Sequence, residues 1–186
     1  MTNSKTVKPL ISNFMPELIR LRRELHAQPE LSDNEQKTAA ILTEFFRQFN
    51  PDEVIAPLGS NGIAFVFGCA RPGPTVVFRC ELDAVPVEEK NDFAYRSRIP
   101  SVSHKCGHDG HMAIMAGFGY LISLNRPEKG ELTLLFQPAE ETGQGAAAVV
   151  DDQKFKNLNP DYAFALHNLP GYPLGAILLK SGTINC

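Results

Sequence analysis

Apolar residues at helical spacing predict a helix near the start of the chain. The members of one apolar stripe recur at intervals of four, three and four residues: Phe14, Leu18, Leu21 and Leu25. The Gln28-Pro29 pair ends this helix, because the residue before a proline avoids helical backbone angles. Four charged residues within positions 20–24 lie mostly off the stripe, and such a run usually faces water. We therefore expect a solvated basic face on the first helix.

A second helix follows a sequence that predicts a capping box. In Ser32-Asp-Asn-Glu35 the serine hydroxyl and the glutamate carboxylate are spaced to accept hydrogen bonds from opposite backbone N–H groups. Pro51 closes the helix. Five apolar residues within it are expected to face inward: Ile41, Leu42, Phe45, Phe46 and Phe49.

Short runs of β-branched and aromatic residues predict strands. Residues 63–67 and 75–78 are separated by the turn-forming sequence Arg71-Pro-Gly-Pro74, so they favour a hairpin. Three later runs also predict strands, at 131–137, 161–166 and 176–179.

Helices are predicted between the later strands. A polar loop is expected over residues 87–105, and helices are expected over 112–124 and 143–152. Helices that alternate with strands indicate the α/β fold class, and the early hairpin would make the sheet mixed. We therefore expect a mixed β-sheet flanked by helices.

Composition excludes several classes of function. The 186 residues carry a net charge of −3, which argues against a nucleic-acid partner. No apolar run reaches the length of a membrane span, and the first residues lack the apolar core of a signal peptide, so we expect no membrane partner. The four cysteines have no CxxC spacing, which favours a reducing compartment. The expected location is the cytoplasm.

A cluster of histidines around a cysteine predicts a metal site. Three of the five histidines fall within His104-Lys-Cys-Gly-His-Asp-Gly-His111. Cys106 and His108 are separated by one glycine, so the backbone can turn sharply and direct both side chains inward. Thiolate, imidazole and carboxylate ligands together select a borderline-soft divalent ion, zinc first. Asp109 is a candidate partner for the ring N–H of a ligand.

Carboxylates follow two of the predicted strands. Glu140 and Glu141 come just after the strand at 131–137, and adjacent side chains there point in different directions. One could hold a metal while the other acts as a general base. Glu81 and Asp83 lie on one side of extended chain after the strand at 75–78, and His167 follows the strand at 161–166. All these groups lie at the carboxyl ends of strands, where ligands bind in open α/β sheets.

Other interpretations of the same residues are weaker. Cys106 beside His108 could be a thiol nucleophile, and Cys106 could be a redox sensor, but no resolving cysteine lies at a useful spacing. Gly143-Gln-Gly-Ala-Ala-Ala148 fits a dinucleotide-binding pattern but starts too far beyond its strand. The remaining cysteines are interpreted as ordinary buried or terminal residues: Cys69, Cys80 and Cys186.

Five segments together resemble the aminoacylase/carboxypeptidase-type dinuclear metallopeptidase family. The similarity is closest to its amidohydrolase subgroup, which includes indoleacetyl-amino-acid hydrolases, hippurate hydrolases and N-acetyldiaminopimelate deacetylases. The segments occur in the family's order and span nearly the whole chain: Arg23-Glu-Leu-His-Ala-Gln-Pro-Glu-Leu-Ser32, Arg79-Cys-Glu-Leu-Asp-Ala-Val-Pro86, the histidine cluster 104–111, Phe136-Gln-Pro-Ala-Glu-Glu141 and Leu166-His-Asn-Leu-Pro-Gly171.

The resemblance implies a function and a role for particular residues. It implies hydrolysis of the amide bond of small N-acyl-amino acids with two divalent ions, zinc first and manganese, cobalt or nickel as alternatives. Glu140 would be the general base, and Asp83 would orient a ligand. Four residues would be metal ligands: Cys106, His108, Glu141 and His167. Glu81 departs from the family's usual aspartate, which leaves its role open.

The resemblance also carries an expectation about domains. Residues 1–186 would form the N-terminal part of a zinc-peptidase-like catalytic domain. A lid and dimerisation domain, and a C-terminal catalytic segment with one more histidine ligand, would lie outside this sequence. Full-length family members are expected to be homo-oligomers. The alternative is a catalytically impaired fragment that binds metal without turnover.

Overall fold

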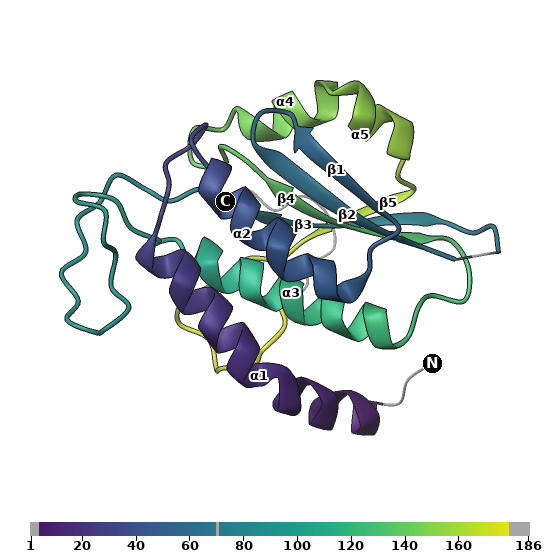
Figure 1. The fold of residues 1–186 in the computed structure, drawn as a ribbon, viewed down its shortest axis with the longest axis horizontal. Coiled ribbons are helices and arrows are strands. Elements are labelled where there is room, and N and C mark those ends of the chain that lie inside the picture. Colours follow the sequence, from purple (N-terminus) through teal and green to yellow (C-terminus); the bar gives the residue numbers. More distant parts are fainter. Residues whose placement is uncertain (1–3, 70, 179–186) are drawn as a thin grey trace.

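The computed structural model describes residues 4–69 and 71–178, which fold into a five-stranded sheet with helices on both faces (Figure 1). The strands are β1 (Glu53–Leu58), β2 (Gly62–Gly68), β3 (Thr75–Glu81), β4 (Glu131–Gln137) and β5 (Tyr162–Ala165). The helices are α1 (Ser4–Ala27), α2 (Gln36–Phe46), the short 3-10 helix η1 (Arg47–Phe49), α3 (His108–Leu124), α4 (Gly145–Asp151) and α5 (Gln153–Leu158). None of the helices described is long and apolar enough to cross a membrane.

The sheet is mixed, as the sequence predicts. Its strand order is β1-β2-β4-β3-β5. β2 pairs antiparallel with β1 and β4, whereas β3 pairs parallel with β4 and β5. Figure 1 shows α1, α2 and α3 on one face and α4 and α5 on the other, which confirms the expected α/β class. The parallel pairing brings the carboxyl ends of β3, β4 and β5 to one edge of the sheet.

The predicted hairpin is wrong. β4 lies between β2 and β3, so the runs at 63–67 and 75–78 are not neighbours in the sheet. The strand along the other edge of β2 is β1, which the sequence pattern did not predict, so β2 lies between β1 and β4. Pro57 lies within β1 and discourages a strand assignment, but an edge strand tolerates proline because one side of its backbone needs no partner.

Two helix predictions need correction and one strand is not found. α3 begins at His108, four residues before the predicted start at 112, so the histidine cluster enters the helix. α5 was not predicted, and α4 is shorter than the predicted helix at 143–152. Residues 176–178 do not form a strand, and residue 179 of that predicted strand lies outside the described residues, as does Cys186.

The predicted capping box does not form. The Ser32 hydroxyl donates to Asp83 at 2.7 Å, and Glu35 accepts from the backbone N–H of Ala139 at 2.8 Å. The Thr38 N–H at the start of α2 donates to Glu30 at 2.8 Å instead. Ser32 and Glu35 therefore tie α2 to the ends of β3 and β4, because folding offers them distant partners that the local pattern does not reveal.

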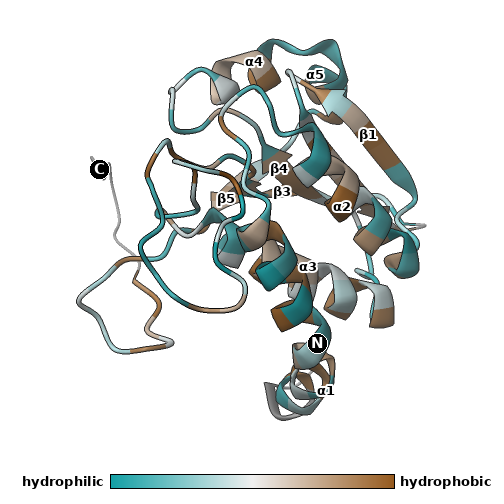
Figure 2. Ribbon diagram, turned by 60° about the vertical axis from the view of Figure 1, so that its left-hand side comes forward, coloured by the Kyte–Doolittle hydropathy of each residue, from teal (hydrophilic) through white to brown (hydrophobic). Residues whose placement is uncertain are grey.

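Aromatic packing holds α2 against the sheet. Phe46 is fully buried, stacks on Phe65 with ring centroids 4.0 Å apart, and meets the edge of Phe136 at 5.4 Å. Leu21 and Leu25 from the α1 stripe belong to the same core. Figure 2 shows hydrophobic positions gathered on the strands and on the helices that face them.

Phe46→Ala should lower the free energy of unfolding by about 3–5 kcal/mol, because it leaves a cavity among packed rings. Ile114→Ala is a control on α3, since the Ile114 side chain is 59% exposed, and it should change stability by less than about 0.5 kcal/mol. Urea unfolding of both variants measures the difference. Equal stabilities would contradict this account of the core.

Candidate metal centre

His108 lies at the amino end of α3, where the backbone turns sharply. The preceding residue, Gly107, has φ 94°, a left-handed conformation that favours glycine. A side chain there would also meet Asn168, since an added Cβ would lie 2.6 Å from the Asn168 side-chain oxygen. The glycine between Cys106 and His108 is therefore required by backbone shape and by the close approach of a neighbouring loop.

A hydrogen bond orients the His108 ring. Nδ1 lies 2.7 Å from the backbone carbonyl of Asp83, which can only accept, so Nδ1 carries a proton. Nε2 is buried and has no hydrogen-bond partner within the part of the chain that the structure describes. Burial disfavours the charged ring, but the Asp83 hydrogen bond and the charges of Glu81 and Asp83 outweigh it and raise the pKa of His108. The position therefore attracts positive charge.

The two adjacent glutamates face this nitrogen. Glu140 Oε2 and Glu141 Oε1 each lie 3.7 Å from His108 Nε2. The turn after β4 that places them passes through Ala139, whose φ is 47°, and the Ala139 N–H is held by Glu35. The side chains of Glu140 and Glu141 are 37% and 24% exposed, so solvent reaches both carboxylates.

Cys106 belongs to the same cluster. Burial, together with a hydrogen bond and the negative charge of Glu141 and the further charge of Glu140, raises the pKa of Cys106 to about 12. The thiolate is unstable beside these carboxylates unless a cation joins them. The donor set of thiol, imidazole and carboxylate includes one buried nitrogen, His108 Nε2, with no hydrogen-bond partner in residues 4–69 and 71–178. This set fits a borderline-soft divalent ion such as zinc.

His167 approaches from the end of β5. Its ring centroid is 4.7 Å from that of His111 and 6.2 Å from that of His108, and its Nδ1 lies 2.7 Å from the Asn168 carbonyl oxygen. His108, His111 and His167 offer nitrogens within 4.8 Å of one another, as do the ligand atoms of His108, Glu140 and Glu141. The two triads share His108 and include two other predicted ligands, Glu141 and His167, whereas Cys106 belongs to neither triad.

Asp83 connects three parts of this centre. It accepts hydrogen bonds from the Ser32 hydroxyl at 2.7 Å and from the Glu141 N–H at 3.0 Å, and its Oδ1 lies 3.5 Å from His108 Nδ1. Burial would raise the pKa of Asp83, but these hydrogen bonds outweigh burial and lower it to about 2. Asp83 is therefore ionised, and it lies where it can orient both His108 and the Glu141 loop.

Glu81 has a separate role that the sequence left open. Its carboxylate lies 2.6 Å from Arg79 Nη1 and 2.8 Å from His111 Nδ1. The other nitrogen of His111 lies 3.1 Å from the Asn168 N–H. Glu81 thus holds His111 against the loop that carries His167. Both nitrogens of His111 are occupied by protein groups, which favours a supporting role for this residue over a ligand role.

Among the residues that the structure describes, Asp109 bonds to α1 and not to the ring of a predicted ligand. Its carboxylate lies 2.8 Å from His26 Nδ1 and 2.8 Å from Arg22 Nε, on the side of α3 that faces α1. On the predicted solvated face of α1, Arg20 is exposed, and Arg22, whose side chain is 40% exposed, also pairs with the buried Asp109. His26 was missed because a single histidine in a helix shows no pattern until α1 packs on α3.

Comparisons with known proteins agree with this arrangement. The family model described as "Peptidase family M20/M25/M40" matches residues 77–182. The chain belongs to peptidase family M20/M25/M40.

Two relatives of this M20/M25/M40 chain have names that refer to acylated amino acids. The N-acetyl-L-cysteine deacetylase of Bacillus subtilis (strain 168) is 35% identical over 94% of this chain and 41% of its own length. The N-acyl-L-amino acid amidohydrolase of Geobacillus stearothermophilus is 39% identical over 76% of this chain and 38% of its own length.

A solved structure in the M20 family has the same fold. The YXEP protein of Bacillus subtilis, described as a dinuclear metal-binding peptidase, matches with a TM-score of 0.85 and 32% identity. The match covers 92% of this chain and 47% of that one. This chain therefore spans less than half the length of the relatives named here.

Gly107→Ala should destabilise this M20/M25/M40 chain by about 1–2 kcal/mol, because alanine resists a left-handed conformation. It should also weaken binding of a divalent ion, with zinc as the probe, since the new methyl group displaces Asn168 beside His167. Gly110→Ala is the matched control one helical turn away, where an added Cβ meets nothing within 4 Å, and it should stabilise the chain by about 0.4–1 kcal/mol. Urea unfolding and zinc titration test both variants, and similar behaviour of the two would contradict the role of Gly107.

Proposed function

We propose that the protein is a metal-dependent amidohydrolase that cleaves the amide bond of N-acyl-amino acids. The observation that carries the proposal is a cluster at the edge where β3 and β4 end: Cys106, Glu140, Glu141 and the Nε2 of His108, which has no hydrogen-bond partner among the described residues. Family membership supports hydrolysis, and the names of the Bacillus subtilis and Geobacillus relatives support the substrate class.

Four residues would hold the metal in this proposal: Cys106, His108, Glu141 and His167. Their chemistry favours zinc, and manganese, cobalt or nickel also suit mixed ligand sets of this kind. A relative in the family is described as dinuclear, which supports two divalent ions in a complete site. A bound divalent ion would supply a Lewis acid that stabilises negative charge on the oxygen atoms of water and of the scissile carbonyl.

Glu140 would act as the general base. Its carboxylate is near His108 Nε2 but is partly exposed, so it can reach both the metal side and the open side of the site. It would take a proton from the attacking water as the new carbon–oxygen bond forms. It would then give that proton to the amide nitrogen as the carbon–nitrogen bond breaks, which releases the acid and the amino acid.

Asp83 would hold two of the proposed metal ligands in position without contacting the substrate. It contacts His108 and the Glu141 N–H at once, so it fixes the relative position of two proposed ligands.

We also propose that residues 1–186 are the N-terminal part of a catalytic domain, because the relatives are about twice as long. The lid domain and the last histidine ligand implied by the resemblance would belong to the part that this chain does not span.

In the full-length enzyme, Glu140→Gln should lower hydrolysis of N-acetyl-amino acids by about 10²–10⁴-fold while leaving zinc content near that of the wild type. Glu141→Gln is the matched variant, and it should lose zinc because it removes a ligand. Turnover assays and metal analysis of the same samples separate the two residues. If Glu140→Gln loses zinc and Glu141→Gln retains it, the roles proposed for the two residues are exchanged.

Zinc binding should release about one proton from Cys106, because the raised pKa keeps the thiol protonated at neutral pH and the metal requires the thiolate. Zinc affinity should therefore rise with pH, and Cys106→Ser should bind zinc more weakly and release about one proton fewer. Calorimetry in two buffers of different ionisation enthalpy counts the protons. Cys69→Ser, remote from the cluster, is the control, and proton release unchanged in Cys106→Ser would exclude Cys106 as a ligand.

A further inference from the structure

His26 occupies a buried position between two carboxylates. It is 4% exposed in the last turn of α1. Its Nδ1 lies 2.8 Å from Asp109 Oδ2, and its Nε2 lies 3.0 Å from Glu89 Oε2. Ionised carboxylates can only accept hydrogen bonds, so each ring nitrogen must carry a proton to form both bonds. The geometry therefore requires the positively charged imidazolium.

The groups around His26 are consistent with this charge. Burial opposes ionisation of Glu89, but the Ser97 N–H, Lys105 and Asn91 lower the pKa of Glu89 to about 2. Burial likewise opposes ionisation of Asp109, but the hydrogen bond with His26 and the charge of Arg22 keep the pKa of Asp109 below its ordinary range.

The pKa of His26 and the other groups around its ring are also consistent with a charged imidazolium. The hydrogen bond with Asp109 outweighs burial and raises the pKa of His26 above 6.5. His104, with its ring centroid 6.4 Å away, is deeply buried, and burial lowers the pKa of His104 to about 4, so it remains neutral. The rings of Phe93 and Tyr95 cover the imidazole at 5.6 and 5.7 Å between centroids. Arg23 lies over the Tyr95 ring at 4.8 Å.

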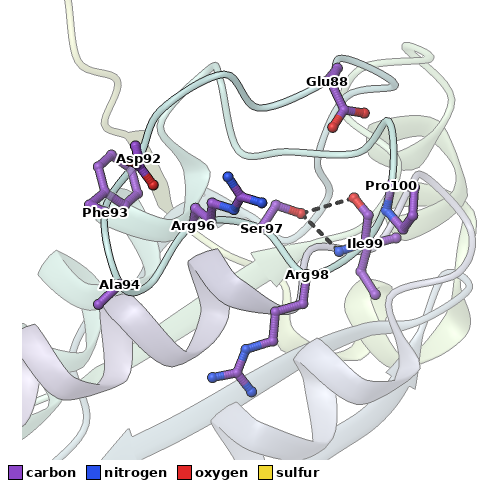
Figure 3. A pocket seen from close by; sticks show the side chains of 9 residues that line it. All are labelled: Glu88, Asp92, Phe93, Ala94, Arg96, Ser97, Arg98, Ile99 and Pro100. Atoms are coloured by element: carbon purple, nitrogen blue, oxygen red, sulfur yellow. Dashed lines mark hydrogen bonds between the residues drawn. The ribbon is translucent and has the colours of Figure 1, made fainter.

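Glu89 connects His26 to the whole loop at 87–105. It accepts hydrogen bonds from the Ser97 N–H at 2.7 Å, from Asn91 at 2.9 Å and from Lys105 at 2.9 Å. These partners come from the start, middle and end of the loop. The same loop encloses a surface pocket of about 530 Å³ between Glu88 and Pro100, which Figure 3 shows from close by.

We propose that His26 is a positioning residue that clamps the loop at 87–105 to the first turn of α3. Asp109 is adjacent to His108, so the clamp also restrains the His108 ring; this consequence rests on the proposed function. The sign of the pH dependence follows from the raised pKa. The clamp is complete below pH 6.5, the ordinary value for histidine, and is lost as pH rises through the raised pKa of His26.

The protonation state of His26 can be measured in the 186-residue chain without a substitution. Long-range proton–nitrogen NMR spectra of histidine-labelled protein, recorded from about pH 5 to about pH 9, follow all five imidazoles. Without zinc, the raised pKa values of His26 and His108 predict two rings that keep both protons above pH 6.5. Bound zinc should take the place of a proton on the His108 ring, whereas the His26 ring should still carry both protons. Glu89→Gln should move the titration of one of the two rings to lower pH, which assigns that ring to His26. Five rings that all titrate at or below the ordinary value would overturn the proposal.

Zinc affinity measured against pH tests the positioning role. His26→Gln should bind zinc about three- to tenfold more weakly than the wild type at low pH, which is less than the about 10–100-fold lost with a direct partner of a ligand. The gap should close above the pKa of His26, because the wild type then loses its clamp too. Arg20→Gln is the control, since Arg20 forms only exposed ion pairs on the same helix among the described residues. A purely structural role would give a gap that does not depend on pH.

The two experiments separate failure of this inference from failure of the proposed function. If no variant and no wild-type sample binds zinc, the proposed metal centre fails, while the NMR titration still decides the state of His26. If zinc binds and His26→Gln matches the wild type at every pH, the positioning role is overturned. If His26→Gln does not fold, Glu89→Gln takes its place in the zinc titration, and equal affinities to wild type at all pH values would overturn the role.

Discussion

The parallel pairing of β3 with β4 on one side and β5 on the other is the constraint on which the site depends. Glu81 lies opposite Gln137, and Arg79 lies opposite Ala165. In this register the residues that follow each strand emerge at the same edge of the sheet, although they lie far apart in the sequence. Any slip in register would separate these chain segments, and with them the groups that converge on His108.

The carboxylates at this edge of the sheet need many hydrogen-bond and ion-pair partners, because two of them are both charged and buried. Asp83 and Glu81 are buried carboxylates, and desolvation penalises each of them. Each is stabilised by hydrogen bonds or ion pairs to a backbone N–H, a hydroxyl, an arginine or a histidine. Glu140 and Glu141 are partly exposed and lie beside a protonated thiol. Protein contacts therefore stabilise the supporting carboxylates, although Oδ1 of Asp83 has no hydrogen-bond partner among the described residues. The groups that face His108 Nε2 are those whose charge a cation would balance.

The sequence predicted the elements whose patterns are local. The α1 stripe, the strand over residues 131–137 and the helix after the histidine cluster could all be predicted, because burial repeats with the period of the backbone. Strand partners could not be predicted in the same way. The runs at 63–67 and 75–78 are consecutive among the predicted strands, but β4 lies between them in the sheet. The edge strand β1 contains Pro57, and a proline disfavours the prediction of a strand although β1 is paired in the sheet.

Residue chemistry and spacing along the chain were thus enough to select Cys106, His108 and the two glutamates as a metal-binding set, because those residue types share few other uses. Contacts between distant segments were decided only by tertiary structure. Ser32 and Glu35 have the spacing of a capping box, but they bond to the ends of β3 and β4. Asp109 lies beside a proposed ligand in sequence, but it faces His26. A side chain selects its partner by hydrogen-bond geometry and burial in the folded state, and neither quantity exists until the helices and strands have packed.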